Sequence, residues 1–134
     1  MNPTDRKLQI SLLLLRLGVA AVMLPWAIDK LVRPDHAAGV FATFYALPGL
    51  ESWAFTGLGI VQILLVLAFL AGIARTWSYG LVTLLHAVST FSSYRQYLDP
   101  FSGGNLLFFA AWPMLAACIA LFLLRDRDRL LTWK

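Results

Sequence analysis

The sequence is poor in cysteine and in charge. Its 134 residues include one cysteine, Cys118, so the chain by itself can form neither an internal disulfide nor a two-cysteine thiol relay. We interpret Cys118 as a small core residue, a common role of free cysteines. Charged residues make up only 13% of the chain, fewer than the surface of a soluble domain of this length requires. The composition therefore argues against a soluble globular protein.

Motifs of several enzyme classes are also missing. The sequence holds no phosphate-binding loop, no GxGxxG fingerprint and no HExxH pair. His36 and His86 are expected at different depths, which disfavours a bis-histidine haem, and no Cys/His cluster has the spacing of a zinc site. The serines near His86 lack an Asp–His arrangement that would activate them. We therefore expect no metal site and no stand-alone catalytic activity.

Long apolar runs dominate what is present. The chain is 60% hydrophobic, and its mean hydropathy is +0.73. A bilayer crossing needs about 20 mostly apolar residues. The runs that qualify are 8–32, 53–73, 77–97 and 105–124. Because they occupy most of the chain, the sequence predicts an all-α, integral membrane four-helix bundle that forms one transmembrane domain over residues 1–134. A short interfacial helix is expected near residues 40–46, in the first outer loop.

The distribution of basic residues predicts a topology. The formal net charge is +4, and most basic residues precede the first run, separate the second from the third, or follow the fourth. Four crossings put these three places on one side. That side holds Arg6, Lys7, Arg75, Arg125, Arg127, Arg129 and Lys134, and the other holds Lys30, Arg33 and Arg95. The positive-inside rule then places both termini in the cytoplasm. We expect a multi-pass protein of the bacterial inner membrane, with lipid and a membrane-protein partner or second copy around it, and no nucleic acid.

The first run could also open a cleaved signal peptide, since Arg6 and Lys7 precede it. The run is too long for that, and Arg16 and Pro25 interrupt it. We interpret it as a retained membrane span.

Polar side chains interrupt three of the runs. Charge in hydrocarbon is costly, so such residues are candidates for a functional site. At a rise of 1.5 Å per residue, Arg16 should lie about 12 Å deep and His86 about 14 Å deep, with Gln62 near the midplane. The sequence therefore predicts that they converge. With Trp26 they would form a ligand site, a quinone being the candidate ligand; the alternative is that they only link helices. No carboxylate is expected at the depth of Arg16, so its predicted partners are carbonyl groups or an anion such as a lipid phosphate or a quinone oxygen.

A second polar group is expected at the outer face. It comes from the end of the first run, the following loop and the turn between the third and fourth runs. Its members are Asp29, Lys30, Asp35, His36, Glu51, Tyr94, Arg95, Tyr97, Asp99 and Asn105. With Trp26 they would form a mouth for a small ligand, or they would make a solvated rim.

The opening stretch resembles a known family. The segment LLLLRLGVAAVMLPWAIDKL is similar to the first helix of DoxX-like membrane proteins, with a Leu-rich stretch, an Arg, a Gly, a bulky apolar run and a Lys. These are Leu12–Leu15, Arg16, Gly18, Val22–Leu24 and Lys30. The layout of four runs matches over the whole chain. Ala27 stands where many such proteins have a Gly. Only Arg16 and Lys30 transfer as motif positions.

The resemblance implies a four-helix membrane protein, and it suggests three functions. Some DoxX-like proteins are subunits of thiosulfate:quinone oxidoreductase, and others are linked to oxidative-stress complexes or to maturation of periplasmic enzymes. The preferred hypothesis is a non-catalytic accessory or assembly subunit of a membrane redox complex. The alternatives are a quinone-binding subunit of an oxidoreductase, such as a thiosulfate:quinone type, and a small-solute permease that works as an oligomer. A stable protein partner would favour the first, a retained quinone the second, and solute flux the third.

Overall fold

The computed structural model describes residues 2–133, with the backbone alone for Ser52. Within this range the chain is helical and has no strand. The elements are α1 (Pro3–Val32), α2 (Pro34–Phe44), α3 (Ser52–Ala71), α4 (Arg75–Ser92), α5 (Tyr94–Leu98), η1 (Asn105–Ala110), α6 (Ala111–Leu123) and η2 (Arg125–Arg127), where η marks a 3₁₀ helix. Among the described residues, three helical stretches are long and apolar enough to cross a membrane: Pro3–Val32, Trp53–Ala71 and Asn105–Leu123. The prediction of an all-α protein is confirmed for these residues, and three of the helical stretches have the length and composition that a membrane crossing needs.

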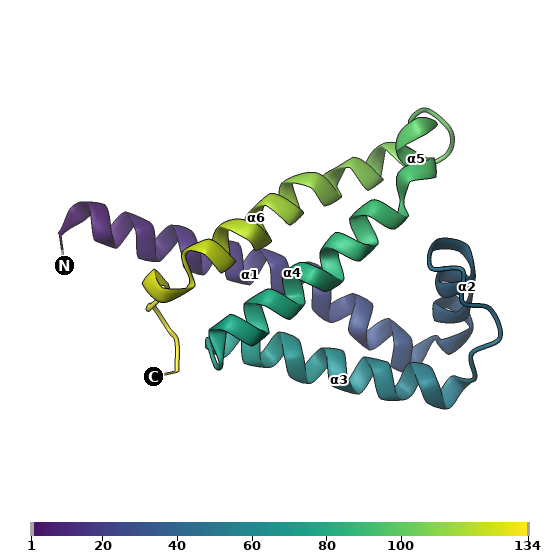
Figure 1. Ribbon diagram of the computed structural model, residues 1–134, viewed down its shortest axis with the longest axis horizontal. Helices are drawn as coiled ribbons and strands as arrows, with labels where there is room; N and C mark the ends of the chain where they lie inside the picture. The colour runs from purple at the N-terminus through teal and green to yellow at the C-terminus, as the bar shows by residue number, and fades with distance from the viewer. Residues whose placement is uncertain (1, 134) are drawn as a thin grey trace.

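The long helices pack as two pairs, α1 with α3 and α4 with α6 (Figure 1). Both ends of the chain and the α3–α4 turn lie at one end of the molecule, on the left of Figure 1, which we call the closed end. The two pairs diverge toward the other end, which we call the α2 end because α2 lies there between them. α2 contacts both sides, since Phe41 packs on Phe55 of α3 and the Tyr45 hydroxyl, just after α2, is 2.6 Å from Ser89 Oγ of α4.

Several predicted boundaries differ from the structure. The predicted loop helix is present as α2, but it begins at Pro34. Proline is favoured in the first turn of a helix, because a backbone N–H at that position has no acceptor within the helix. The predicted run 77–97 is divided, because α4 ends at Ser92 and α5 follows. With its many hydroxyl groups, α4 is not among the three stretches apolar enough to span a membrane. The predicted run 105–124 begins as 3₁₀ helix, since Pro113 cannot donate the α-helical bond to Phe109.

A common core joins all four long helices. Its buried members are Leu12, Val19, Ala20, Met23, Val66, Phe69, Tyr79, Val82, Cys118 and Leu121. Cys118 belongs to this core, as the sequence predicted. The core therefore fixes the pairing of α1/α3 against α4/α6 near the closed end.

Gly59 lets α1 and α3 approach closely. A Cβ at this position would lie 2.9 Å from the Ala27 carbonyl oxygen and 3.0 Å from Leu31 Cδ2. The carbonyl belongs to the helix backbone, so it cannot move aside cheaply. A Cβ at Gly57, two residues earlier in α3, would meet nothing within 4 Å.

We expect Gly59→Ala to lower the free energy of unfolding by about 1–3 kcal/mol, the usual cost of overpacking. Gly57→Ala is the matched control, and it should be neutral or stabilise by up to about 1 kcal/mol through helix propensity. Unfolding by SDS in mixed micelles, followed by circular dichroism, measures both. Equal effects of the two substitutions would contradict the close approach at Gly59.

Candidate functional site

A buried ion pair joins α1 to the C-terminal segment, which we define as residues 124–133. Arg16 Nε lies 2.9 Å from Asp128 Oδ2, and their side chains are 1% and 0% exposed. The Tyr79 hydroxyl of α4 donates to the same carboxylate oxygen at 2.6 Å. Asp128 therefore ties three separate parts of the chain together at the closed end.

The other nitrogens of Arg16 bind backbone carbonyl groups. Nη1 donates to Leu70 O at 2.5 Å and, more weakly, to Leu131 O at 3.4 Å, and Nη2 donates to Leu130 O. The sequence predicted either carbonyl groups or an anion such as a lipid phosphate or a quinone oxygen as partners, and carbonyl groups are present. It expected no carboxylate near Arg16, and this was wrong, because the C-terminal segment turns back after α6 and carries Asp128 into the bundle.

Further hydrogen bonds hold the C-terminal segment in place. Gln9 is 1% exposed; its Nε2 donates to Arg127 O at 2.5 Å, and its Oε1 accepts from Arg129 N at 2.7 Å and Leu130 N at 3.2 Å. Arg75 Nη1 donates to Arg125 O at 2.9 Å and to Asp128 O. Sequence reasoning missed Gln9. The only local signal was a polar residue followed by apolar ones, which is common at the start of a membrane helix.

Arg16, Gln62 and His86 do not converge, contrary to the prediction. Gln62 Oε1 accepts from Lys30 Nζ at 2.8 Å, and it precedes Leu70, the partner of Arg16, by two helical turns, or about 12 Å. His86 Nε2 donates to Ala111 O at 2.9 Å, between α4 and α6. The predicted depths were counted from the ends of the apolar runs. α1 has 30 residues and α3 only 20, so equal depths along the two runs are not equal heights in the bundle. Arg16 binds Leu70 O and therefore lies at the level of the last turn of α3, not at its middle.

The predicted polar face of α4 is turned toward α6. Thr83 Oγ1 donates to its own helix at Tyr79 O (2.8 Å) and to Cys118 O of α6 (3.2 Å), and His86 is only 8% exposed. These bonds link two helices through side chain and backbone. They leave the Nε2–H of His86 engaged within the chain.

The predicted outer mouth is two groups instead of one. On one side, Asn105 Nδ2 donates to Asp99 O at 2.8 Å, and Arg95 Nε donates to the Tyr94 hydroxyl at 3.2 Å. Tyr97, on α5, donates to Thr90 O at 2.8 Å. On the other side lie Asp29, Lys30 and His36, while Glu51 accepts from Trp53 Nε1 at 3.1 Å. The division arises because α1/α3 and α4/α6 diverge toward this end (Figure 1).

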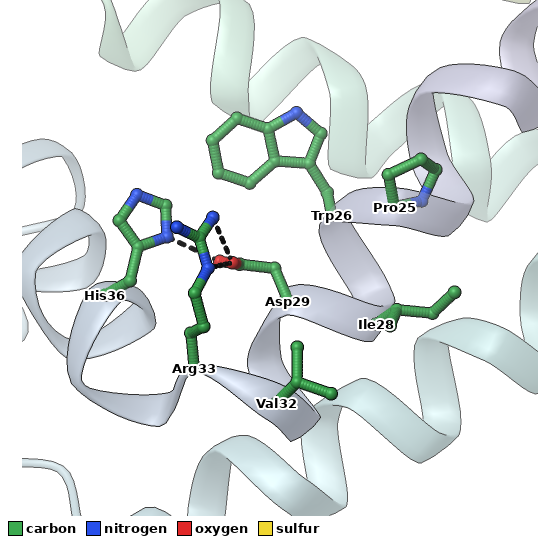
Figure 2. Close-up of a pocket in the computed structure, with 7 residues that line it drawn as sticks. All are labelled: Pro25, Trp26, Ile28, Asp29, Val32, Arg33 and His36. Carbon is green, nitrogen blue, oxygen red and sulfur yellow. Dashed lines mark hydrogen bonds and ion pairs between the residues drawn. The ribbon is translucent and has the colours of Figure 1, made fainter.

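The group on α1 and α2 surrounds a pocket of about 300 Å³, shown in Figure 2 and lined by Pro25, Trp26, Ile28, Asp29, Val32, Arg33 and His36. Asp29 Oδ1 accepts from Arg33 at 2.6 Å, and Asp29 Oδ2 is 2.6 Å from His36 Nδ1. The rings of Trp26 and His36 are stacked with centroids 6.0 Å apart. The sequence predicted Trp26, Asp29 and His36 as members of the outer mouth. Arg33 was missed, although Asp29 and Arg33 have the spacing of a helical ion pair.

Comparisons with protein families, with curated proteins and with solved structures find no match to this chain. The fold and the bonds described above therefore define the class: an all-helical protein with helices able to cross a membrane, whose buried polar groups bind mainly its own backbone.

Proposed function

We propose that this chain is a DoxX-like integral membrane protein that acts as a non-catalytic accessory or assembly subunit of a membrane redox complex. One contrast carries the proposal. The buried polar side chains bind other parts of the chain, whereas large apolar side chains face outward on every long helix. Examples of the latter are Leu14 (63% exposed), Val61 (65%), Leu84 (57%) and Leu123 (72%). Such a surface suits lipid and neighbouring membrane helices, since apolar exteriors of this extent are unusual on soluble monomers.

The DoxX-like assignment is supported by the two motif positions. Arg16 and Lys30 both lie on α1, and both bind α3, at Leu70 O and Gln62 Oε1. Their spacing along α1 therefore corresponds to two contacts that set how α1 lies on α3. A residue pair with this role suits a motif that preserves a fold rather than a reaction.

We propose four crossings, by α1, α3, α4 and η1/α6, with both termini in the cytoplasm of a bacterium. The closed end supports this orientation, because Arg6, Lys7, Arg75, Arg127 and Arg129 belong to the segments that meet there; Lys134 lies outside the described residues. α4 is the one crossing that is not among the three apolar stretches. It can cross because its polar face packs on α6, away from lipid.

The alternative functions gain less support. A quinone site made by Arg16 and His86 needs free donors that face one ligand, but these donors bind Asp128, Leu70, Leu130 and Ala111. A permease needs a path formed between several copies of the chain, and no contact described above favours it.

The test is extraction into native-lipid nanodiscs, followed by mass spectrometry and absorbance spectroscopy. We expect a membrane-protein partner in a fixed ratio that carries a flavin, haem or iron–sulfur cofactor, and no quinone above the level in nanodiscs from cells that lack the chain. A chain without such a partner, or with a stoichiometric quinone of its own, would contradict the accessory role. Solute flux in proteoliposomes of the pure chain would favour the permease.

A further inference from the structure

We propose that the pocket between α1 and α2 binds the phosphate group of a membrane phospholipid. The proposal rests on the membrane placement proposed above and goes beyond it, because it assigns a ligand to a site that an accessory role does not require. Three observations carry it: a fixed cationic side chain, outward N–H groups, and an apolar wall that continues into the exposed surface of α1.

The cationic side chain is held by a buried carboxylate. Asp29 is 8% exposed; its Oδ1 accepts from Arg33 Nε at 2.6 Å and forms an ion pair with Arg33 Nη2, also at 2.6 Å. Its Oδ2 accepts from His36 Nδ1 at 2.6 Å. Arg33 thus uses only part of its donor set on Asp29, and both side chains are positioned by the carboxylate. Fixing these side chains in advance removes much of the ordering cost when an anion binds.

The remaining donors face outward. Within residues 2–133, no hydrogen bond uses Arg33 Nη1 or the indole N–H of Trp26. Figure 2 shows the guanidinium, imidazole and indole grouped around Asp29. The Arg33 side chain is 65% exposed and that of His36 42%. A guanidinium with free N–H groups is well suited to phosphate oxygens.

The apolar wall points to a lipid rather than a free anion. Pro25, Ile28 and Val32 complete the pocket, and Ile28 and Val32 are 46% and 68% exposed. They occupy the last turns of α1, next to Trp26. Tryptophan and arginine beside apolar residues at the end of a span occur where headgroups meet acyl chains. The phosphate would contact Arg33 and Trp26, and the start of the acyl chains would lie along Ile28 and Val32.

The test measures retention of phosphatidylglycerol by the full-length protein. The protein is reconstituted into nanodiscs of phosphatidylcholine with a small fraction of phosphatidylglycerol, then released and examined by native mass spectrometry. We expect Arg33→Gln to weaken phosphatidylglycerol binding about tenfold, as loss of a charge-assisted contact does. Trp26→Phe keeps a ring but loses the N–H, and it should weaken binding a few-fold.

Arg95→Gln is the matched control, because Arg95 is an exposed arginine at the same end of the molecule and contacts Tyr94. It should leave retention unchanged. Equal losses in the Arg33 and Arg95 variants would overturn the proposal, because they would show non-specific attraction of charge. Circular dichroism and the thermal midpoint of each variant confirm folding, and a normal lipid count in a well-folded Arg33→Gln protein also overturns it.

Inorganic phosphate distinguishes the two sources of the anion. Tens of millimolar phosphate should not displace the lipid if the apolar wall contributes; full displacement would overturn the assignment to a lipid. The Arg33→Gln protein is expected to keep the protein partner described above. Loss of lipid binding without loss of the partner supports the pocket alone, and lack of a partner with intact lipid binding contradicts only the accessory role.

Discussion

Asp128→Ala is expected to lower the free energy of unfolding by about 3–5 kcal/mol, because it leaves the Arg16 guanidinium buried without its counter-ion. The pair is almost wholly inaccessible to solvent, so water cannot replace the lost carboxylate without opening the C-terminal segment. The Tyr79 hydroxyl would lose its acceptor as well. Unfolding by SDS in mixed micelles measures the change.

Two further variants make the result specific to the pair. Asp126→Ala removes a carboxylate two residues away that is exposed, and it should change stability by less than about 0.5 kcal/mol. The double substitution Arg16→Met with Asp128→Leu removes both charges, and it should recover most of the loss, as replacing a buried ion pair with apolar residues often does. A double variant as unstable as Asp128→Ala, or an equal effect of Asp126→Ala, would contradict the role assigned to the pair.

Gln9→Leu is expected to release the C-terminal segment while the helices stay folded. The substitution leaves Arg127 O, Arg129 N and Leu130 N without their partner, and each unsatisfied buried group costs about 1–3 kcal/mol. The segment can reduce this cost by opening to water. We expect the opened fraction to rise on the order of a hundredfold, as in other cases of local unfolding. Trypsin cleavage after Arg127 and Arg129 reports the opening directly.

Gln96→Leu is the control for that experiment. Gln96 is a glutamine too, partly buried where Gln9 is fully buried, and among the described residues its Oε1 has no hydrogen-bond partner. It lies on α5, at the α2 end. Removing it should leave trypsin cleavage of the C-terminal segment unchanged. Faster cleavage in both variants would mean that general loosening, and not the bonds of Gln9, is responsible.

The predicted convergence of Arg16, Gln62 and His86 shows why the depth of a residue cannot be counted along a single helix. The predicted depth of Arg16 was counted from Leu8, as if the packed part of the helix began where the apolar run begins. The structure shows α1 starting earlier, at Pro3 with Asn2 as its cap, and its first turns are covered by the C-terminal segment through Gln9. A depth becomes meaningful only when a second helix supplies the reference. For Arg16 that helix is α3, and its last turn is the level at which Arg16 binds.

The Lys30–Gln62 bond also shows that the position of a residue along one helix does not fix where its side chain binds. Lys30 was assigned to the outer rim and Gln62 to the interior, yet the two meet at 2.8 Å. A lysine side chain spans several ångströms, so its ammonium reaches inward along α3 from a backbone position near the helix end. Residue position along a helix therefore places the Cα, whereas the charged group can act a turn or more away.

The sequence by itself determined the helical class and the approximate positions of α1, α3 and η1/α6. These depend on composition and on local periodicity, which a single segment carries. Only the tertiary structure decided that Asp128 meets Arg16, that Gln9 holds the C-terminal segment, and that Trp26, Asp29, Arg33 and His36 line one open pocket. Most of these contacts join residues far apart in the chain or from different helices, and the C-terminal segment has no regular pattern. Their geometry depends on how α1/α3 and α4/α6 meet at the closed end and diverge beyond it, which no local pattern encodes.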